Sequence, residues 1–379
     1  MRAGWEAKTL GDICEMYQPK TISAKDMMPQ GEYPVFGANG IIGRFNKFNH
    51  EEPQLLITCR GATCGSVNIS EPKSWITGNA MVVKPRTSNL LIKFLEYFFR
   101  GGVDIQKAIT GAAQPQITRT NLEPLQIAFP YDLKEQQRIV TILDQAFEGI
   151  AKARANAEQN LQNARALFES HLQSVFSDAT HNNNLVALSN LATDITDGDH
   201  MPPPKAVTGI PFITIGNIVK DTRIIDFTDT FKVSAEYFNK LKANKKPKLG
   251  DVLYTVTGSF GIPVLVKNNQ EFCFQRHIGL IRPKHDVSSE WLCYLLSSPQ
   301  LLKQAKDGAT GTAQKTVSLK VLRSFQVPRL PLENQNKMVV ELDTLSKETK
   351  RLEAIYQRKI TCLDELKKSL LQQAFAGEL

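Results

Sequence analysis

The residues that most resemble a reactive site are the run Asp197-Gly198-Asp199-His200 and two glycine turns, Gly61–Gly65 and Gly258–Gly261. Carboxylates beside an imidazole could hold a cation, and a glycine turn after a strand could cradle a phosphate. Met201 and three prolines follow the first run, however, and such a composition is typical of a turn. Neither glycine turn has the spacing of a phosphate-binding or dinucleotide-binding motif, so we expect turns in which glycine adopts a positive φ.

Other catalytic signatures are missing from the sequence. It contains no G-x-x-x-x-G-K-[ST] phosphate loop, no H-E-x-x-H metal pair, and no Asn-Pro-Pro-Tyr or Asn-Pro-Pro-Phe of an adenine methyltransferase. Its six cysteines lack C-x-x-C spacing, so we predict neither zinc nor a disulfide framework, and we expect Cys59 and Cys64 to be buried or half-buried thiols. No apolar run could span a bilayer and no secretory pattern is present, which favours a cytoplasmic location.

The net charge of +8 is unevenly distributed along the chain. Residues 1–132 carry 14 Lys and Arg against 12 Asp and Glu, or +2, and residues 185–330 carry 19 against 12, or +7. Residues 133–184 carry 5 against 6 and residues 331–379 carry 8 against 8, so these two segments are nearly neutral. A basic excess in one kind of segment favours a polyanionic partner, although this signal is weak alone.

Two long helices must position these basic segments. Apolar and small residues from Ile139 to Val175 recur at steps of three and four, which predicts one seam on a helix from Leu133 to Phe176. The same seam recurs 199 residues later, from Met338 to Ala374. It also repeats the irregular place where one step of four residues directly follows another step of four. Chance would not reproduce that irregularity, so we infer an internal duplication. Each helix of about 65 Å needs a packing partner for its seam.

The segments before each helix are duplicated too. Residues 56–61 parallel 253–258, and residues 79–85 parallel 277–283, each pair reading as strands. Each half is therefore a globular segment followed by a helix. The predicted fold is α+β, with two mixed α/β domains separated by a two-helix antiparallel coiled coil and a pseudo-two-fold internal repeat. In the alternative, each helix packs separately into its own domain. The predicted boundaries are 1–132 and 185–330 for the domains, and 133–184 and 331–379 for the helices.

These motifs together resemble the specificity subunit of a type I restriction–modification system, over essentially the whole chain. The most specific elements are Thr-Gly-x-Ala-Gln at 110–114 and 310–314, Leu-x-x-Gln-x-x-Ile/Met-Val at the start of each helix, and the ending 370–379. The opening 5–13 is also similar to the family's usual start. The resemblance implies two target-recognition domains, each reading half of a bipartite DNA site, and helices that set the spacer and dock two methyltransferase (modification) subunits.

The resemblance also implies a non-catalytic subunit without a cofactor of its own. S-adenosylmethionine, ATP and Mg are then expected on the partner subunits, which include the restriction subunits, and no membrane is involved. A fused enzyme is disfavoured because no catalytic domain fits into the chain. A coiled-coil DNA-binding adaptor or repressor that acts without methyltransferase partners remains the alternative.

With two target-recognition domains expected, DNA contacts should come from turns and strand ends, because no helix-turn-helix is evident. The matched loop residues Gln114, Gln116, Gln314 and Lys315 fit helix capping or domain packing at least as well as DNA contact, and Lys242, Lys245, Lys246 and Lys248 could face phosphate or solvent. The candidate DNA-binding residues are Arg44, Lys47, Thr58, Arg60 and Thr63 in the first domain, and Lys205, Asn217, Lys220, Thr257, Ser259, Arg276 and His277 in the second.

Overall fold

The computed structural model describes residues 4–37, 39–111, 113–201, 203–312 and 314–379. Two residues of the duplicated Thr-Gly-x-Ala-Gln motif, Ala112 and Ala313, lie outside these ranges. The chain forms two compact units. We call Met1–Gln159 with Tyr356–Leu379 the first unit, and Asn160–Ile355 the second unit. Among the described residues, no helix has both the length and the apolar character that a bilayer-spanning segment needs.

The two long helices are α4 (Leu133–Asn182) and α9 (Leu332–Ala376). Asp132 starts α4, because its Oδ1 accepts the backbone N–H of Lys134 at 2.9 Å. Gly377 ends α9 with a φ of 75°, and the next N–H, of Glu378, donates to the carbonyl of Gln373 at 2.8 Å. This is the left-handed glycine stop that sequence rules favour at a helix end. The first helix runs six residues past the predicted Phe176.

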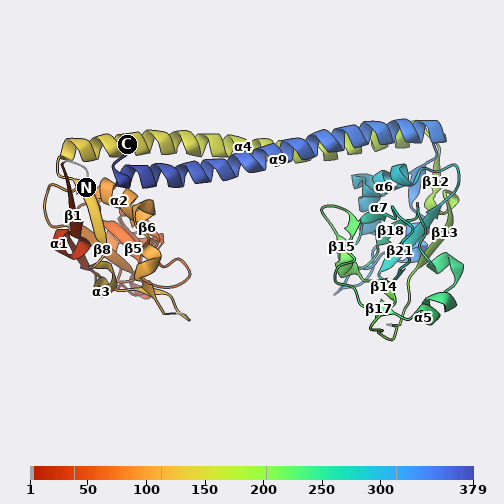
Figure 1. Ribbon diagram of the computed structural model, residues 1–379, viewed down its shortest axis with the longest axis horizontal. Coiled ribbons are helices and arrows are strands. Elements are labelled where there is room, and N and C mark those ends of the chain that lie inside the picture. Colours follow the sequence, from red (N-terminus) through yellow and green to blue (C-terminus); the bar gives the residue numbers. More distant parts are fainter. Residues whose placement is uncertain (1–3, 38, 112, 202, 313) are drawn as a thin grey trace. The chain divides into compact units, whose positions relative to one another are not determined.

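The long helices pack against each other in antiparallel directions within each unit (Figure 1). In the first unit, Arg138 donates to the carbonyl of Leu379 at 2.7 Å, while Arg154, further along α4, pairs with Asp364, earlier in α9. In the second unit, Arg165 pairs with Glu353 at 3.1 Å and His171 with Glu341 at 2.7 Å. The predicted seam is confirmed, since its buried members are Ile139, Leu143, Ile150, Ala157 and Ala164 in α4, and Leu342, Thr349, Ile360 and Ala374 in α9. Separate packing of each helix is wrong.

The first domain is built on an antiparallel four-stranded sheet of order β2-β8-β5-β6. A second sheet has the order β4-β3-β7, in which β3 pairs with β7 in parallel, and short pairs β1-β11 and β9-β10 complete the domain. The strands are β1 (Trp5–Thr9), β2 (Cys14–Tyr17), β3 (Tyr33–Gly37), β4 (Gly40–Phe45), β5 (Leu55–Thr58), β6 (Val67–Ile69), β7 (Trp75–Ile76), β8 (Ala80–Pro85), β9 (Ile109–Thr110), β10 (Gln116–Ile117) and β11 (Gln126–Pro130). The short helices are α1 (Leu10–Ile13), α2 (Ile92–Tyr97) and α3 (Arg119–Leu122).

The second domain repeats this topology strand for strand in its two larger sheets. The order β13-β21-β18-β19 matches β2-β8-β5-β6, and β17-β14-β20 matches β4-β3-β7, again with one parallel pair, β14 with β20. The strands are β12 (Leu185–Ala187), β13 (Ala192–Asp197), β14 (Ile210–Ile213), β15 (Ile218–Val219), β16 (Ile224–Ile225), β17 (Lys232–Val233), β18 (Val252–Thr255), β19 (Pro263–Leu265), β20 (Cys273–Phe274), β21 (Ile278–Pro283) and β22 (Gln326–Pro328). The helices are α5 (Ala235–Lys240), α6 (Ser289–Ser297), α7 (Pro299–Gly308) and α8 (Leu319–Arg323). The predicted internal repeat is therefore confirmed.

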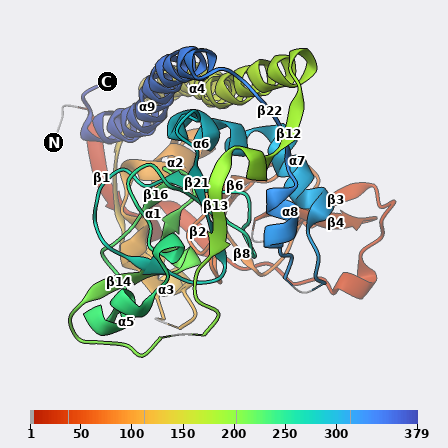
Figure 2. The same cartoon turned by 90° about the vertical axis from the view of Figure 1, so that its right-hand side faces the viewer.

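The core of each domain is completed by the far end of the other half's helix. Leu371 and Ala374, near the end of α9, belong to the first domain's core, and the Phe375 ring lies 5.1 Å from that of Phe94 in α2. In the second unit, the matched positions Leu172 and Phe176, near the end of α4, belong to the core together with Trp291 of α6 and Tyr254 of β18. Figures 1 and 2 show α6 between the long helices and the second domain's sheet.

Candidate nucleic-acid interface

In each domain an inner strand of the main sheet, β5 or β18, leads into a glycine turn held against the loop that precedes α3 or α8. In the first domain, Arg60 forms a bridge with Gln116, and the N–H of Gly61 donates to the carbonyl of Pro115 at 3.1 Å. In the second, Thr257 bridges Thr316, and the N–H of Gly258 donates to the carbonyl of Lys315 at 3.0 Å. The predicted positive φ is confirmed at Gly61, Gly65, Gly258 and Gly261, with values of 88°, 89°, 68° and 93°.

A hollow of about 380 Å³ opens beside the first of these bridges. Arg60 and Gln116 line it with two side chains that sequence reasoning did not select, Gln18 and Arg119. Gln18 reaches it from just beyond β2, where its Nε2 donates to the carbonyl of Gly78 at 3.0 Å. Guanidinium and amide groups around one hollow are the side chains that read guanine and adenine edges. Gln18 and Arg119 lay outside the duplicated motifs, so the repeat gave no signal for them.

The other candidates of the first domain separate into exposed and engaged side chains. Lys47 and Thr63 are exposed, as are Arg60 and the loop residue Gln114. Arg44 is exposed in part, but its Nε donates to the carbonyl of Gly31 at 2.6 Å and its Nη2 to that of Glu32 at 2.5 Å, so it closes the hairpin of β3 and β4. Thr58 has 0% of its surface exposed. Because its side chain is buried in this structure, Thr58 cannot contact DNA with that side chain.

The second domain's candidates separate in the same way. Side chains exposed to solvent are those of Lys205, Lys220, Ser259, Arg276, Gln314 and Lys315, while His277 is half-buried. Thr257 is 5% exposed and Asn217 is 9% exposed. The Oδ1 of Asn217 accepts the N–H of Thr214 at 2.9 Å, and its Nδ2 donates to the carbonyl of Asp229 at 3.1 Å. Since both ends of its amide are bonded inside the domain, the structure corrects the assignment of Asn217 as a base-reading candidate to a turn-stabilising one.

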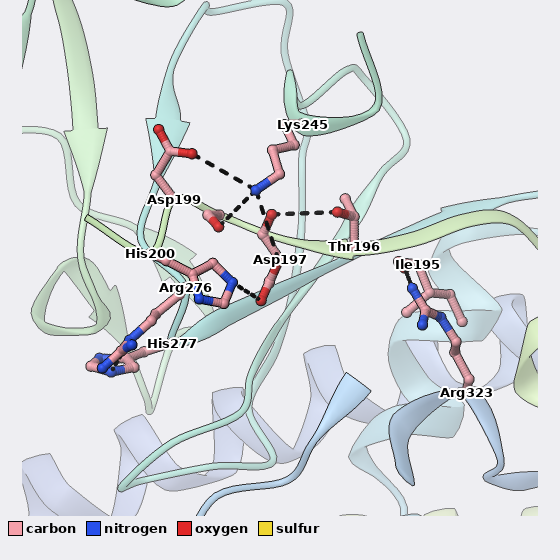
Figure 3. Close-up of polar contacts among 10 residues, drawn as sticks. Ile195, Thr196, Asp197, Asp199, His200, Lys245, Arg276, His277 and Arg323 are labelled. Atoms are coloured by element: carbon pink, nitrogen blue, oxygen red, sulfur yellow. Dashed lines mark hydrogen bonds and ion pairs between the residues drawn. The ribbon is translucent and has the colours of Figure 1, made fainter. Parts of the chain in front are cut away.

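The run at 197–200 is not the expected turn: Asp197 ends β13, Asp199 forms a bridge with Gln275, and the run supports the candidate Arg276 (Figure 3). The Lys245 ammonium lies 3.9 Å from Asp197 and 3.7 Å from Asp199, and it donates to the carbonyl of Gly198 at 3.1 Å. A protein cation thus stands between the two carboxylates. The carbonyl of Asp199 accepts the backbone N–H of Arg276 at 3.1 Å. In the part of the chain that the structure describes, no group of three His, Cys, Asp or Glu could hold a metal ion.

The lysine cluster at 242–248 is only partly available to a polyanion. Lys245 is engaged with the two aspartates, which corrects its assignment as a phosphate-directed or solvated residue. Lys246 donates to the carbonyl of Asn239 at 3.2 Å, and its ammonium lies 4.8 Å from the centre of the Phe238 ring. Lys242 and Lys248 are exposed. Two of the four lysines, Lys245 and Lys246, therefore have ammonium groups engaged inside the domain, and of these two Lys245 faces carboxylates.

The thiols near the glycine turn of the first domain are not poised as nucleophiles. Cys59 is fully buried and Cys64 is half-buried, as predicted, and burial raises the pKa of both thiols. A raised pKa keeps a thiol protonated and unreactive near neutral pH.

His50 does not line the hollow, but its Nε2 lies 2.8 Å from the hydroxyl of Tyr17, which does. Burial, and then the positive charge of Lys84, lowers the pKa of His50. It is therefore uncharged at neutral pH.

Comparisons with known proteins agree on one family. The family model described as type I restriction modification DNA specificity domain matches residues 2–159 and 193–360. The chain is 30% identical over 141 residues to the type I restriction enzyme EcoprrI specificity subunit of Escherichia coli, covering 36% of this chain and 34% of that protein. It is 25% identical over 198 residues to the EcoBI specificity subunit of Escherichia coli, covering 52% of this chain and 40% of that protein. The matched segments thus span less than half the length of these relatives.

Solved structures share the fold over the full length. A chain in a structure described as the basis of complex assembly and conformational transition of the type I R-M system has a TM-score of 0.79 at 19% identity, covering 100% of this chain and 99% of that chain. The HsdS subunit from Thermoanaerobacter tengcongensis has a TM-score of 0.64 at 19% identity, covering 100% of this chain and 98% of that chain. At this identity, the likeness concerns the fold.

Proposed function

Because this chain belongs to the type I restriction modification DNA specificity family, we propose that it is the sequence-specific DNA-binding subunit of a type I restriction–modification complex. Each domain reads one half of a bipartite site on double-stranded DNA. Two modification subunits dock on the chain and carry S-adenosylmethionine and methyl transfer, while restriction subunits carry the ATP- and Mg-dependent steps. The chain itself is non-catalytic and acts in the cytoplasm, where chromosomal DNA is available.

The pair of strand-end bridges is the observation that carries this proposal. Both domains hold a glycine turn against a pre-helix loop with the same backbone bonds, at 3.1 Å in one and 3.0 Å in the other. The side chains at this shared backbone arrangement differ, since the exposed Arg60 and Gln116 stand where the second domain has the buried Thr257 and the half-buried Thr316. A protein that recognises two unlike half-sites needs the same backbone support in both domains and different side chains at the positions that contact bases.

The division of charge supports a polyanionic ligand. The second domain carries +7, and exposed cations such as Lys205, Lys220 and Arg276 lie outside the long helices. The helical segments are close to neutral, at −1 and 0. Phosphate contacts give affinity and steer association, while base contacts give specificity. Neutral helices are in keeping with a role in spacing and in docking protein partners.

Reconstitution with the modification subunits tests the proposal. DNA modified by the complex, read by methylation-sensitive sequencing, should reveal one bipartite site, and the chain alone should leave DNA unmodified. Exchange of residues 185–330 for the corresponding domain of another family member should change one half-site only. Methyl transfer by the purified chain, or a change in both half-sites, would contradict the proposal. Failure to form a complex with modification subunits would favour a DNA-binding adaptor that acts alone.

Single side chains can be tested with a matched control. Arg60→Ala removes a guanidinium at the first domain's bridge and should weaken binding to the cognate site by roughly 5- to 150-fold, corresponding to about 1–3 kcal/mol for a bidentate base contact. The loss should relax the base preference in one half-site only. Lys359→Ala removes one positive charge from an exposed position on α9 and should leave that preference unchanged. Equal losses for both variants would indicate a general charge effect.

A further inference from the structure

Each long helix carries one fully buried glutamine in its first turn, and the two are related by the internal repeat. They are Gln136 in α4 and Gln335 in α9, 199 residues apart, with 0% and 1% of their surface exposed. Glutamine is seldom buried so completely, because its amide needs several hydrogen-bond partners away from water. The same unusual choice at both positions calls for a shared role.

The first glutamine ties α4 to two separate segments of the first domain. Its Oε1 accepts the backbone N–H of Leu91 at 2.9 Å, just before α2. Its Nε2 donates to the carbonyl of Asn89 at 2.8 Å and to that of Pro130, at the end of β11, also at 2.8 Å. One side chain therefore joins the helix, the loop that enters α2 and the last strand of the domain.

The second glutamine repeats this pattern bond for bond in the second unit. Its Oε1 accepts the N–H of Ser288 at 2.8 Å, just before α6. Its Nε2 donates to the carbonyl of Asp286 at 3.2 Å and to that of Leu330, after β22, at 2.9 Å. An amide supplies one acceptor and two donors at the end of a three-bond arm, a combination that neither Glu nor Lys offers.

A second matched contact lies two turns further along each helix. The Tyr97 hydroxyl at the end of α2 donates to Asp144 of α4, and the Tyr294 hydroxyl of α6 donates to Asp343 of α9 at 2.6 Å. Each tyrosine contact lies eight residues from its glutamine, or about 12 Å along the axis at 1.5 Å per residue. Two fixed points on one helix define the direction of the domain relative to the helix axis.

The hydrogen-bond donors of these contacts keep their protons at physiological pH. The glutamine amide is neutral. Burial, and then the hydrogen bond to the neighbouring carboxylate, raises the pKa of both Tyr97 and Tyr294. The phenols therefore remain protonated donors, and the geometry is held by directional bonds at any physiological pH. Apolar packing alone is non-directional and would allow the helix to turn or slide against the domain.

We propose that Gln136 and Gln335 are positioning residues that fix the orientation of each recognition domain on its own long helix, and so determine which distance between half-sites the protein accepts. This inference rests on the proposed function. Both side chains are buried, and neither belongs to the exposed candidates at the strand ends. They act indirectly, by holding in place the loop that enters α2 or α6.

The test compares Gln136→Met and Gln335→Met with controls one residue further along each helix. Methionine keeps the length and fills the space but offers no amide. The controls are Gln137→Met and Asn336→Met, both at exposed positions. Binding of the complex with its modification subunits is measured on duplexes that carry the cognate half-sites with the spacer shortened by one base pair, unchanged, or lengthened by one. Each buried variant should reduce the preference for the correct spacer at least tenfold, with the base preferences of both half-sites retained.

Hydrogen exchange on the chain alone provides a readout independent of DNA. The amide of Leu91 should exchange at least tenfold faster in Gln136→Met, and that of Ser288 in Gln335→Met, with the opposite unit unchanged. Unchanged exchange, an unchanged spacer preference, or an equal loss of affinity on all three duplexes would overturn the positioning role. If the wild-type complex itself had no spacer preference, the proposed function would fail instead, and the exchange result would still stand.

Discussion

The substitution Leu371→Ala, near the end of α9, tests the inference that the core of each unit depends on the far end of the other half's helix. This leucine is 3% exposed and belongs to the core of the first domain, more than 200 residues along the chain from most of its neighbours. Its Cδ1 packs so closely on the backbone at Gly101 that a Cβ at that glycine would lie 2.7 Å from it. Truncation to alanine therefore opens a cavity where the π-helical turn Phe98–Gly102 meets the long helix.

The expected loss in the free energy of unfolding follows from truncations of buried leucines in general. Replacing a buried leucine with alanine costs about 2–5 kcal/mol, with the spread set by how far the site can collapse. The first unit holds 159 residues from the beginning of the chain and 24 from the end, together 183. For a domain of that size, a loss of about 3 kcal/mol lowers the melting temperature by roughly 6–12 °C. The second unit lacks this side chain and should keep its own transition.

Hydrogen exchange followed by mass spectrometry resolves the two units. Peptides from α2 should lose protection in Leu371→Ala while peptides from α6 keep theirs. The matched variant Leu172→Ala, whose side chain is also 3% exposed, should show the reverse, with α6 deprotected and α2 unchanged. Equal loss in both units, or a loss of under about 0.5 kcal/mol in the mutated unit, would refute the inference that each core depends on the far helix end.

Three further predictions concern single side chains. Alkylation at pH 8 should label the exposed Cys362 first and the buried Cys14 and Cys273 last by peptide mass spectrometry, because burial raises the pKa of both buried thiols to about 12; rapid labelling of either would contradict this. Burial also raises the pKa of Tyr254 above its ordinary 10.0, so its contribution to stability is intact below pH 10 and is lost as the pH rises beyond that value. Tyr254→Phe should remove that alkaline loss and cost under about 0.5 kcal/mol at pH 7 by thermal unfolding, since the hydroxyl has no hydrogen-bond partner among the described residues. Asp251→Ala should destabilise the second unit by about 3 kcal/mol, because it leaves the largely buried Arg282, 2.7 Å away, without its counter-charge; a loss within about 0.5 kcal/mol would show that the pair is dispensable.

The parts of the fold that could be predicted are those that leave a periodic or repeated mark in the sequence. The helical seam has a period near 3.6, and its recurrence after 199 residues revealed both the duplication and the need for a partner helix. Strand-like runs closed by proline marked β8 and β21, one of the two inner strands in each main sheet. The turns at Gly61 and Gly258 could be predicted from the glycines themselves, because glycine readily adopts the positive φ that each turn needs.

The engagement of single polar side chains could not be predicted, because their partners come from distant segments. Arg44, Asn217 and Lys245 are all residue types that contact nucleic acid, and all stand near turns. Their partners, such as Gly31, the carbonyl of Asp229 and the two aspartates beside Lys245, become neighbours only in the folded domain. The hollow-lining residues Gln18 and Arg119 were missed for the same reason, since the hollow is assembled from four segments.

The exchange of helix ends between halves changes how such a chain can be divided or recombined. A domain cut at the predicted boundary of residue 132 would lack Leu371, Ala374 and Phe375, which belong to or pack on its core, and would expose an apolar surface instead. An exchanged segment 185–330 must likewise accept Leu172 and Phe176 from the resident helix. Compatibility in a domain exchange therefore depends on the face that each domain turns toward the helices, while at the strand-end turns the backbone bonds are kept and the side chains differ between the two domains.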